Sequence, residues 1–331
     1  MKKIVVFGAT GNTGKYLIEY LKENLDFKKF SIVAVSRHVD ESSKSINNVS
    51  YVRADISKKA TLKKLDDVNI FAVINLAGAM PATMKTRNFQ KYIDINITGT
   101  LNILEFCLRN KVDRIIYPTT EADLSGYWDK ELVIRSDFER KFPLEGNYAP
   151  YIISKCAAVD LIKTYQNNYG IKAFIFRLPT IYLYKENPYY YVNFKKKKLG
   201  YRTLIDKAIN GEEIEIWGDP NRVKDVVYVK DYCQLIYLAL ISTRCGGIYN
   251  VGTGKGISLE QQINEIVDVF SKDKEFVIKK CPEKSNARQF IMDISKAKEE
   301  LGYCPKYDYH DYLIDFKKEM QKHEKGKDFC N

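Results

Sequence analysis

The sequence lacks both long hydrophobic runs and patterned cysteines. A membrane-spanning helix needs about 18 consecutive apolar residues, and no segment of this 331-residue chain approaches that length. The seven cysteines are scattered, odd in number and without a Cys-x-x-Cys pair, which predicts neither a disulfide framework nor a metal site. Because the chain opens on Met1 and a first strand without a leader segment, we expect a reduced, cytoplasmic protein with no membrane partner.

Acidic residues are fewer than basic ones, 42 against 53, and the formal net charge is +11. Such a balance favours anionic partners. The basic residues are nevertheless spread along the chain, the one dense run is residues 195–198, and no helix-turn-helix or ribonucleoprotein motif is present. We therefore expect no nucleic-acid partner. We interpret residues 187–198 as a mobile, solvated stretch, with contact to a substrate phosphate as the alternative for its lysines.

A glycine-rich turn follows the first apolar run. Residues 4–7 are typical of a buried parallel strand, and the segment 8–14 comes directly after them. Its glycines permit a tight turn and close approach of the backbone to a pyrophosphate, and the next helix supplies unpaired N–H groups for the phosphates. The middle gap is one residue longer than in Gly-x-Gly-x-x-Gly. The predicted cofactor contacts in this turn are Gly8, Thr10, Gly11, Asn12, Thr13 and Gly14.

Tyr151 and Lys155 are spaced to lie on one face of a helix. A phenol with the ordinary pKa of about 10 is a poor base at neutral pH, and a cation about 4 Å away stabilises the phenolate. We therefore predict that Tyr151 is a catalytic acid and base, and that Lys155 lowers its pKa and reaches the cofactor ribose. Together with the glycine turn, the pair predicts hydride transfer with a nicotinamide cofactor.

The glycine spacing and the Tyr151–Lys155 pair resemble those of the extended short-chain dehydrogenase/reductase family, of the NAD-dependent epimerase/dehydratase type that includes UDP-galactose 4-epimerase. The resemblance runs nearly from end to end. Further segments that carry it, in the family's order, are residues 75–78, 96–105, 217–219, 225–231, 249–254 and 293–303.

This resemblance implies an α/β fold, a doubly wound parallel sheet (Rossmann) with a smaller C-terminal α/β substrate lobe. The length of the chain and its alternation of strand and helix patterns agree with such a fold. We expect the two parts to be interleaved in sequence. The dinucleotide-binding domain is predicted to contain residues 1–178 and 223–258, and the substrate lobe residues 179–222 and 259–331.

The resemblance also implies a catalytic Ser or Thr at the end of the fifth strand. Residues 114–120 read as that strand and place Thr120 there, with Thr119 as the fallback, because residues 123–126 differ from the family's Val-Tyr-Gly and leave the register open by one residue. The hydroxyl would position the reacting sugar oxygen. Dehydratases of the family need Thr-Asp-Glu, whereas this chain has Glu121 directly after Thr120. Dehydration is therefore disfavoured, and both epimerisation and keto-reduction stay open.

Cofactor choice depends on the end of the second strand, residues 31–35. NAD-preferring relatives place an acidic residue there, but this chain has Ser36 and Arg37. A guanidinium can pair with a 2′-phosphate through two hydrogen bonds, so these residues favour NADP over NAD; the alternative is an exposed loop arginine. Further cofactor contacts implied by the resemblance are Asp55, Ile56, Leu76, Ala77, Gly78, Asn96 and Leu178.

Substrate contacts are less clear in the sequence. Thr180 replaces an Asn that usually binds the nucleotide diphosphate, and Lys224 and Arg288 are cations able to meet phosphate or simply to be solvated. The full set of predicted substrate contacts is Met80, Thr120, Glu121, Thr180, Lys224 and Arg288.

The function implied by these observations is an NAD(P)-dependent sugar-nucleotide epimerase with Tyr151 as acid and base. The alternative is an NADPH-dependent ketoreductase of a nucleotide-linked keto-deoxysugar, and a third hypothesis is a non-catalytic dinucleotide sensor or RNA-associated relative. The resemblance further implies a homodimer formed by the helix after Asn96 and the helix of Tyr151. The apolar residues at helical spacing that would form it, or would instead face the sheet, are Ile97, Leu101, Leu104 and Leu108.

Overall fold

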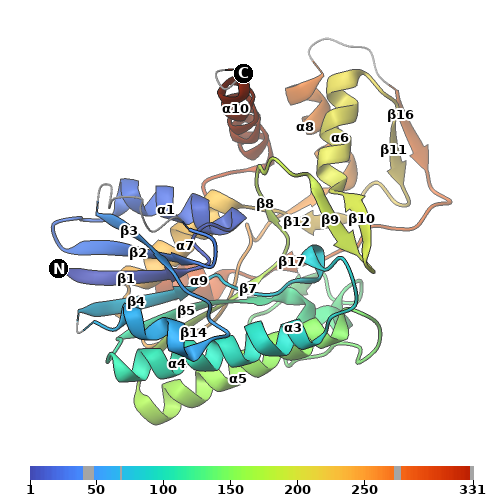
Figure 1. The fold of residues 1–331 in the computed structure, drawn as a ribbon. Coiled ribbons are helices and arrows are strands. Elements are labelled where there is room, and N and C mark those ends of the chain that lie inside the picture. Colours follow the sequence, from blue (N-terminus) through green and yellow to red (C-terminus); the bar gives the residue numbers. More distant parts are fainter. Residues whose placement is uncertain (40–47, 68, 272–276, 329–331) are drawn as a thin grey trace.

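A seven-stranded parallel sheet forms the centre of the computed structural model, which describes residues 1–39, 48–67, 69–271 and 277–328 (Figure 1). The strand order is β14-β7-β5-β4-β1-β2-β3, so the direction of winding reverses between β1 and β4. In open parallel sheets, ligands bind outside the carboxyl ends of the strands at such a reversal. The strands are β1 (Lys2–Phe7), β2 (Phe30–Ser36), β3 (Val49–Arg53), β4 (Ile70–Asn75), β5 (Arg114–Thr120), β7 (Lys172–Leu178) and β14 (Gly246–Asn250).

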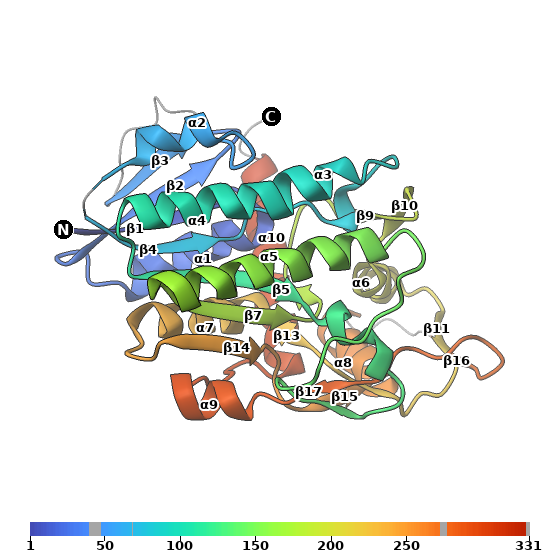
Figure 2. The same ribbon diagram turned by 90° about the horizontal axis from the view of Figure 1, so that it is seen from below.

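Helices cover both faces of this sheet, which confirms the predicted doubly wound fold. Figure 2 shows α4 (Gly99–Arg109) and α5 (Ala149–Tyr169) side by side on one face. On the other face, α1 (Asn12–Asn24) packs on α7 (Val229–Ile241). The short helices before α4 are α2 (Lys59–Leu62) and α3 (Gln90–Tyr92), and a π-helical segment (Ile93–Thr98) joins α3 to α4.

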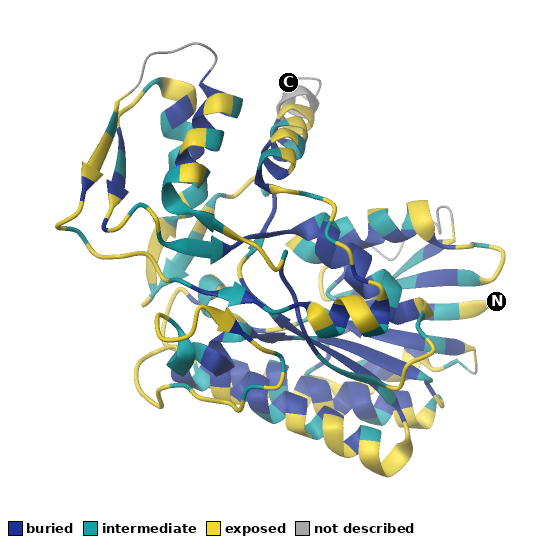
Figure 3. Ribbon diagram, turned by 180° about the vertical axis from the view of Figure 1, so that it is seen from behind, coloured by how far each residue is buried: buried dark blue, intermediate teal, exposed yellow. Residues whose placement is uncertain are grey.

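Two-sided burial explains why the strand sequences are continuously apolar. In β1, Ile4 and Val6 belong to the core beneath α1 and α7, while Val5 and Phe7 belong to the core beneath α4 and α5. Figure 3 shows the central strands largely buried and the exposed positions on the outward sides of the helices.

The smaller lobe contains three helices and a two-stranded parallel sheet in the described part of the chain (Figure 1). Its elements are α6 (Gly200–Asn210), α8 (Leu259–Phe270), α10 (Tyr309–Asp328), β11 (Ile214–Trp217) and β16 (Ile278–Cys281). Two-stranded pairs connect it to the main sheet: β8 (Ile181–Tyr182) with β13 (Val227–Tyr228), β12 (Val223–Asp225) with β15 (Gly256–Ser258), and β6 (Val133–Ile134) with β17 (Ile291–Met292).

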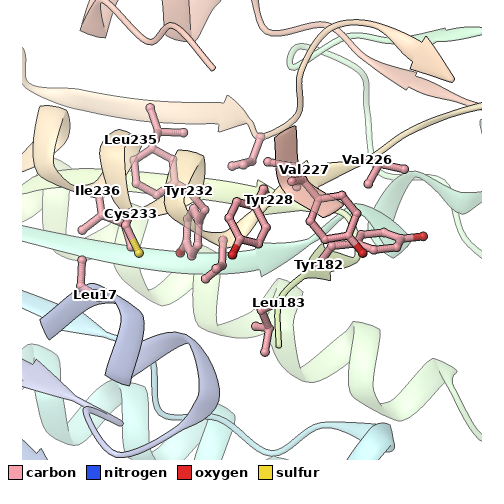
Figure 4. Close-up of a cluster of buried hydrophobic side chains, with 14 of the residues drawn as sticks. Leu17, Tyr182, Leu183, Val226, Val227, Tyr228, Tyr232, Cys233, Leu235 and Ile236 are labelled. Atoms are coloured by element: carbon pink, nitrogen blue, oxygen red, sulfur yellow. The ribbon is translucent and has the colours of Figure 1, made fainter. Parts of the chain in front are cut away.

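One hydrophobic core runs from the sheet into the smaller lobe. Figure 4 shows Leu17 of α1 facing Cys233 and Ile236 of α7, with Tyr228 and Tyr182 continuing the same cluster. The chain also returns to the sheet after α8, because α9 (Ser295–Leu301) packs on β14 and α7. The domain boundaries stay a prediction, and α9 is a part of the predicted substrate lobe that contacts the dinucleotide-binding part.

Residues 189–198 form an antiparallel hairpin, so this segment is not irregular, although Lys195, Lys196 and Lys197 are exposed as expected. β9 (Tyr189–Val192) pairs with β10 (Lys195–Lys198), and the turn residues Asn193 and Phe194 have φ of 48° and 64°. Positive φ at both central residues is what two-residue hairpin turns of type I′ require. The lysines are held as well, because the Lys196 amino group lies 4.3 Å from the centroid of the Tyr189 ring.

The four apolar residues expected on one outer helix face do not all lie there. Leu104 is fully buried beneath the sheet, whereas Leu101 and Leu108 are 37% and 39% exposed. Leu104 therefore belongs to the core, and the exposed apolar stripe of α4 continues instead into Ile93. No helix in the described ranges is both long and apolar enough to cross a membrane.

Candidate active site

The glycine turn between β1 and α1 has space for backbone only. Gly8 has φ of +80°, and a Cβ placed on Gly14 would lie 2.3 Å from the Gly8 carbonyl oxygen. The Gly11 N–H donates to that same carbonyl at 3.0 Å. Because Gly11 has no side chain with which to cap α1, the N–H groups of the first turn stay available to a phosphate. This cradle fits a dinucleotide pyrophosphate.

The turn is tied to the end of β2, where the adenosine end of a dinucleotide would lie. The Thr10 and Ser36 hydroxyl oxygens are 2.6 Å apart. Arg37 is exposed immediately after Ser36, and Arg53 stands opposite Ser36 in the β2–β3 register. The sequence interpretation missed Arg53, because only the strand register brings it beside Ser36.

Asp55 and Ile56 follow β3 and shape the loop beside this end. The Asp55 carboxylate accepts hydrogen bonds from the Ser57 N–H at 3.0 Å and from the Ser57 hydroxyl at 2.8 Å. Ile56 is buried against Gly99, where an added Cβ would lie 2.7 Å from the end of its side chain. Ile56 thus packs the loop onto the start of α4.

The loop after β4 runs beside the glycine turn. A Cβ on Gly8 would lie 2.7 Å from the Ala77 backbone nitrogen and 2.8 Å from the Leu76 carbonyl carbon, so Leu76 and Ala77 press directly on the turn. The next residue, Gly78, faces the Asn96 side chain, whose oxygen an added Cβ would approach to 3.4 Å. Leu76, Ala77, Gly78 and Asn96 therefore form one wall beside the cofactor cradle.

Asn96 clamps that loop to the helix of Tyr151. Its side-chain oxygen accepts from the Ala79 N–H at 2.8 Å, and its amide donates to the Ala79 carbonyl at 3.1 Å and to the Ser154 hydroxyl at 2.9 Å. Ser154 donates in turn to the Tyr151 carbonyl at 2.7 Å. The predicted cofactor contact Asn96 is thus also a positioning group for Tyr151, and Ser154 is a member that the sequence interpretation missed.

Tyr151 lies in the first turn of α5 with only 8% of its surface exposed. Its ring centroid is 5.3 Å from that of Tyr148 and 5.8 Å from that of Tyr92. Burial raises its pKa well above the usual value, and the neighbouring Tyr148 and Glu121 raise it further, while the Thr120 hydroxyl acts in the opposite direction. The phenol of the protein alone is therefore protonated at neutral pH.

Lys155 lies one turn further along α5 and is also buried. Its amino group donates a short hydrogen bond to the Pro118 carbonyl and lies 4.1 Å from the Tyr117 ring centroid. Burial lowers the pKa of Lys155 to about 7. Burial thus favours the neutral form of both groups, and the lowering of the Tyr151 pKa by Lys155 stays a prediction.

Thr120, rather than Thr119, is the hydroxyl beside Tyr151. Its Oγ1 accepts from the Ala122 N–H at 3.2 Å and donates to the Glu121 carboxylate at 3.2 Å. The Thr119 hydroxyl is buried without a hydrogen-bond partner among the described residues. Leu178, at the end of β7, is the register partner of Thr120, which places this predicted cofactor contact at the same edge of the sheet.

Two predicted substrate residues, Glu121 and Lys224, are brought together. Burial raises the pKa of Glu121 to about 7, and the charge of Lys224 opposes that rise. Arg288 is exposed on the same side, with its guanidinium 4.4 Å from the Trp128 ring centroid and its charge acting on Tyr148. Each of these cations lies near an aromatic or acidic group of the site.

The remaining predicted substrate residues, Met80 and Thr180, are exposed. Met80 directly precedes a short helix (Pro81–Thr83), and Thr180 follows β7. Neither contact with a substrate is tested by the protein alone, so both stay predictions.

Comparison with known proteins agrees with this arrangement. Residues 4–252 match the model of the NAD dependent epimerase/dehydratase family. The chain belongs to that family.

Relatives of several activities cover nearly the whole chain. A protein of Methanocaldococcus jannaschii named "Putative UDP-glucose 4-epimerase" is 27% identical over 92% of this chain and 94% of its own length. A dTDP-glucose 4,6-dehydratase of Xanthomonas campestris is 25% identical over 92% and 89%. The crystal structure of UDP-glucose 4-epimerase from Thermotoga maritima with UDP-glucose, 24% identical, superposes with a TM-score of 0.76 over 97% of this chain and 99% of that one.

Membership of the NAD-dependent epimerase/dehydratase family makes this chain an NAD-dependent enzyme of the extended short-chain dehydrogenase/reductase type. The fold follows the pattern predicted from the sequence. Within the described ranges, no group of three or more His, Cys, Asp or Glu side chains is arranged to hold a metal ion.

The hairpin of residues 189–198 adds a wall to the family's site that the sequence interpretation missed. Its tip residue Phe194 packs on the cluster that contains Tyr151, Tyr92 and Met84. The neighbouring Asn193 accepts a hydrogen bond from Asn147 at 3.4 Å. The available signal was the Asn between an aromatic run and a lysine run, because Asn tolerates the positive φ of a tight turn.

Proposed function

We propose that this enzyme is an NAD(P)-dependent sugar-nucleotide epimerase. The observation that carries the proposal is the Tyr151 phenol beside the Thr120 hydroxyl at the carboxyl end of β5, the same edge of the parallel sheet as the glycine cradle after β1. Support comes from the M. jannaschii relative, whose name is that of a UDP-glucose 4-epimerase and whose similarity covers nearly the whole of both chains.

Three side chains have separate roles in the proposed proton transfer. Bound nicotinamide supplies a hydride acceptor and donor for the sugar carbon. Tyr151 takes the proton of the sugar hydroxyl, and Thr120 orients that oxygen. Lys155, protonated, favours negative charge on the phenol oxygen and holds the ribose. The keto sugar then turns so that the opposite face of its carbonyl carbon receives the hydride. Tyr151 returns the proton to the oxygen, and the configuration at that carbon is inverted.

This chain lacks the second of the two carboxylates that dehydration requires. The residue after Glu121 is Ala122, and the next acidic group, Asp123, is buried in an ion pair with Arg177 at 2.9 Å. A carboxylate held in this way cannot act on the substrate. The structure therefore supports the sequence-based preference against the reaction of the X. campestris relative.

The second candidate is an NADPH-dependent ketoreductase, which Arg37 favours together with Arg53. Both arginines stand at the carboxyl ends of β2 and β3, beside Ser36, where a 2′-phosphate of NADP would lie. We propose that NADP binds more tightly than NAD, whichever reaction is catalysed.

Arg37→Ala is expected to raise the Kd for NADPH about tenfold or more and to leave the Kd for NADH unchanged, because only NADPH carries the 2′-phosphate. Fluorescence titration of the stripped protein measures both constants. Arg244→Ala, at an exposed arginine before β14, is the matched control and should change neither. An equal loss of affinity for NADPH and NADH in Arg37→Ala would contradict the contact with the 2′-phosphate.

The reaction is tested by incubating the enzyme with UDP-glucose, UDP-N-acetylglucosamine and dTDP-glucose and a trace of cofactor, and by following the sugar by proton NMR. The proposal predicts that one nucleotide sugar converts to its 4-epimer until equilibrium, with no net change in cofactor. Oxidation of NADPH in step with keto-sugar consumption would favour the ketoreductase. Absence of conversion with every sugar would contradict the epimerase proposal.

We also propose a homodimer through the outer faces of α4 and α5. The exposed apolar residues Leu101 and Leu108 lie on α4, Ile93 lies in the π-helical segment that leads into it, and Ile153 on α5 is 44% exposed. A second copy of the same surface would bury these side chains.

A further inference from the structure

The Thr120 hydroxyl links Tyr151 to a carboxyl group. A hydroxyl has one proton and two acceptor sites. The proton of Thr120 is directed at Glu121 at 3.2 Å, and one acceptor site takes the Ala122 N–H at 3.2 Å. The Thr120 hydroxyl also acts to lower the pKa of the Tyr151 phenol, and its remaining acceptor site is where a proton relay would receive the phenol proton. The phenol, the hydroxyl and the carboxylate are thus the candidate members of a proton chain, in which the hydroxyl donates to the carboxylate.

Glu121 is suited to be the end of this chain. The groups that face it are Lys224 from β12, Tyr151 from α5, Tyr148 directly before that helix, and Asp123 on its own segment. Burial brings the pKa of Glu121 to about 7, so both protonation states are populated near neutral pH. Tyr151, by contrast, has a pKa raised well above its usual value, so a deprotonated Tyr151 is unfavourable near neutral pH.

We propose that Glu121 stores the proton that Tyr151 removes from the sugar. This inference rests on the proposed function. The sugar O–H proton moves to the Tyr151 oxygen, the Tyr151 proton moves to Thr120, and the Thr120 proton moves to the Glu121 carboxylate. The C–H bond of the same carbon breaks with its electron pair, which leaves as hydride to the oxidised nicotinamide. Reversal of these steps on the other face of the keto sugar restores every group.

The direction in which kcat changes with pH distinguishes Glu121 from Lys155. Glu121 must be ionised to accept the proton, so kcat falls as the pH decreases through about 7. Lys155 must be protonated, so kcat falls as the pH rises through about 7. The wild-type profile is therefore bell-shaped, and only its acid limb belongs to Glu121.

Glu121→Gln keeps the size of the side chain but cannot accept a proton. It is expected to lower kcat at least about tenfold, to leave KM within about threefold, and to abolish the acid limb. Thr120→Val should also abolish that limb, whereas Thr120→Ser, which keeps the hydroxyl, should retain it. Glu131→Gln, at an exposed glutamate, is the matched control. A Glu121→Gln enzyme that keeps the acid limb would overturn the relay. So would one in which only KM and thermal stability change, because that result indicates a structural role.

A second measurement does not depend on turnover. The carboxyl C=O band of Glu121, assigned in infrared difference spectra by its loss in Glu121→Gln, should titrate near neutral pH and shift when Tyr151→Phe or Thr120→Val interrupts the chain. An unshifted band would overturn the relay even if every nucleotide sugar fails as a substrate. Failure of wild-type turnover alone contradicts the proposed function and leaves the infrared result to decide the relay.

Discussion

Tyr151→Phe lowers kcat about a thousandfold and leaves the Kd for the nicotinamide cofactor within about threefold. The size of the loss is that of a positioned acid and base, because phenylalanine fills the same buried space and removes only the phenol oxygen. The ring contacts with Tyr148 and Tyr92 and the clamp from Asn96 through Ser154 to the Tyr151 carbonyl do not use that oxygen. The fold around the site should therefore survive.

Steady-state kinetics with equilibrium cofactor titration measures both quantities. Tyr169→Phe is the matched control, since it makes the same change on the same helix at a residue that is 53% exposed, and it should leave kcat unchanged. A Tyr151→Phe enzyme within tenfold of the wild type would remove Tyr151 from the chemistry. Loss of cofactor binding would instead show that the substitution damages the site.

Asp123→Ala lowers the free energy of unfolding by about 3–5 kcal/mol, the range found when one partner of a buried ion pair is removed. Asp123 and Arg177 have side-chain exposures of 4% and 3% and share two hydrogen bonds, of 2.9 and 3.2 Å. Burial raises the pKa of Asp123 more than Arg177 lowers it. The pair therefore gains little from its own attraction, but a guanidinium left alone in the core is costly.

Chemical denaturation measures this loss. The double variant Asp123→Leu with Arg177→Met should recover most of it, because both charges are then absent. Asp137→Ala breaks an Arg–Asp pair whose side chains are 59% exposed for Arg135 and 70% for Asp137, and it is expected to cost less than about 1 kcal/mol. Equal losses for the buried and the exposed pair would contradict the argument from burial.

Local spacing in the sequence was sufficient to predict much of the site. The glycine turn after β1 and the Tyr151–Lys155 helix are each set by a few consecutive residues, whose geometry follows from backbone sterics and the helix period. The end of β5 was predicted to within one residue, and the structure places Thr120 rather than Thr119 beside the phenol.

Properties that depend on packing at long range could not be predicted in the same way. Leu104 has the same spacing as Leu101 and Leu108, and only the direction of the sheet decides that it is buried. The pKa of Lys155 depends on burial by elements far apart in the sequence. Arg53 reaches Ser36 only through strand register.

The hairpin at residues 189–198 shows how composition can mislead. Four consecutive lysines suggested a solvated loop; three of them are exposed, but the segment is a strand, because β10 is paired along its length with the tyrosine-rich strand β9. Tyrosine and valine favour the pleated conformation, and the cross-strand ring contact of Lys196 with Tyr189 accommodates a charge. The tip then places Phe194 on the cluster that contains Tyr151.

The most direct test of transient hydride transfer within one site uses a nucleotide sugar that carries deuterium on the epimerised carbon. The reaction is run in ordinary water with a pool of unlabelled cofactor, and the product is examined by NMR and mass spectrometry. The account predicts a 4-epimer that keeps its deuterium, because the same hydride leaves and returns within one site. Loss of the deuterium to water or its appearance in the cofactor pool would contradict it.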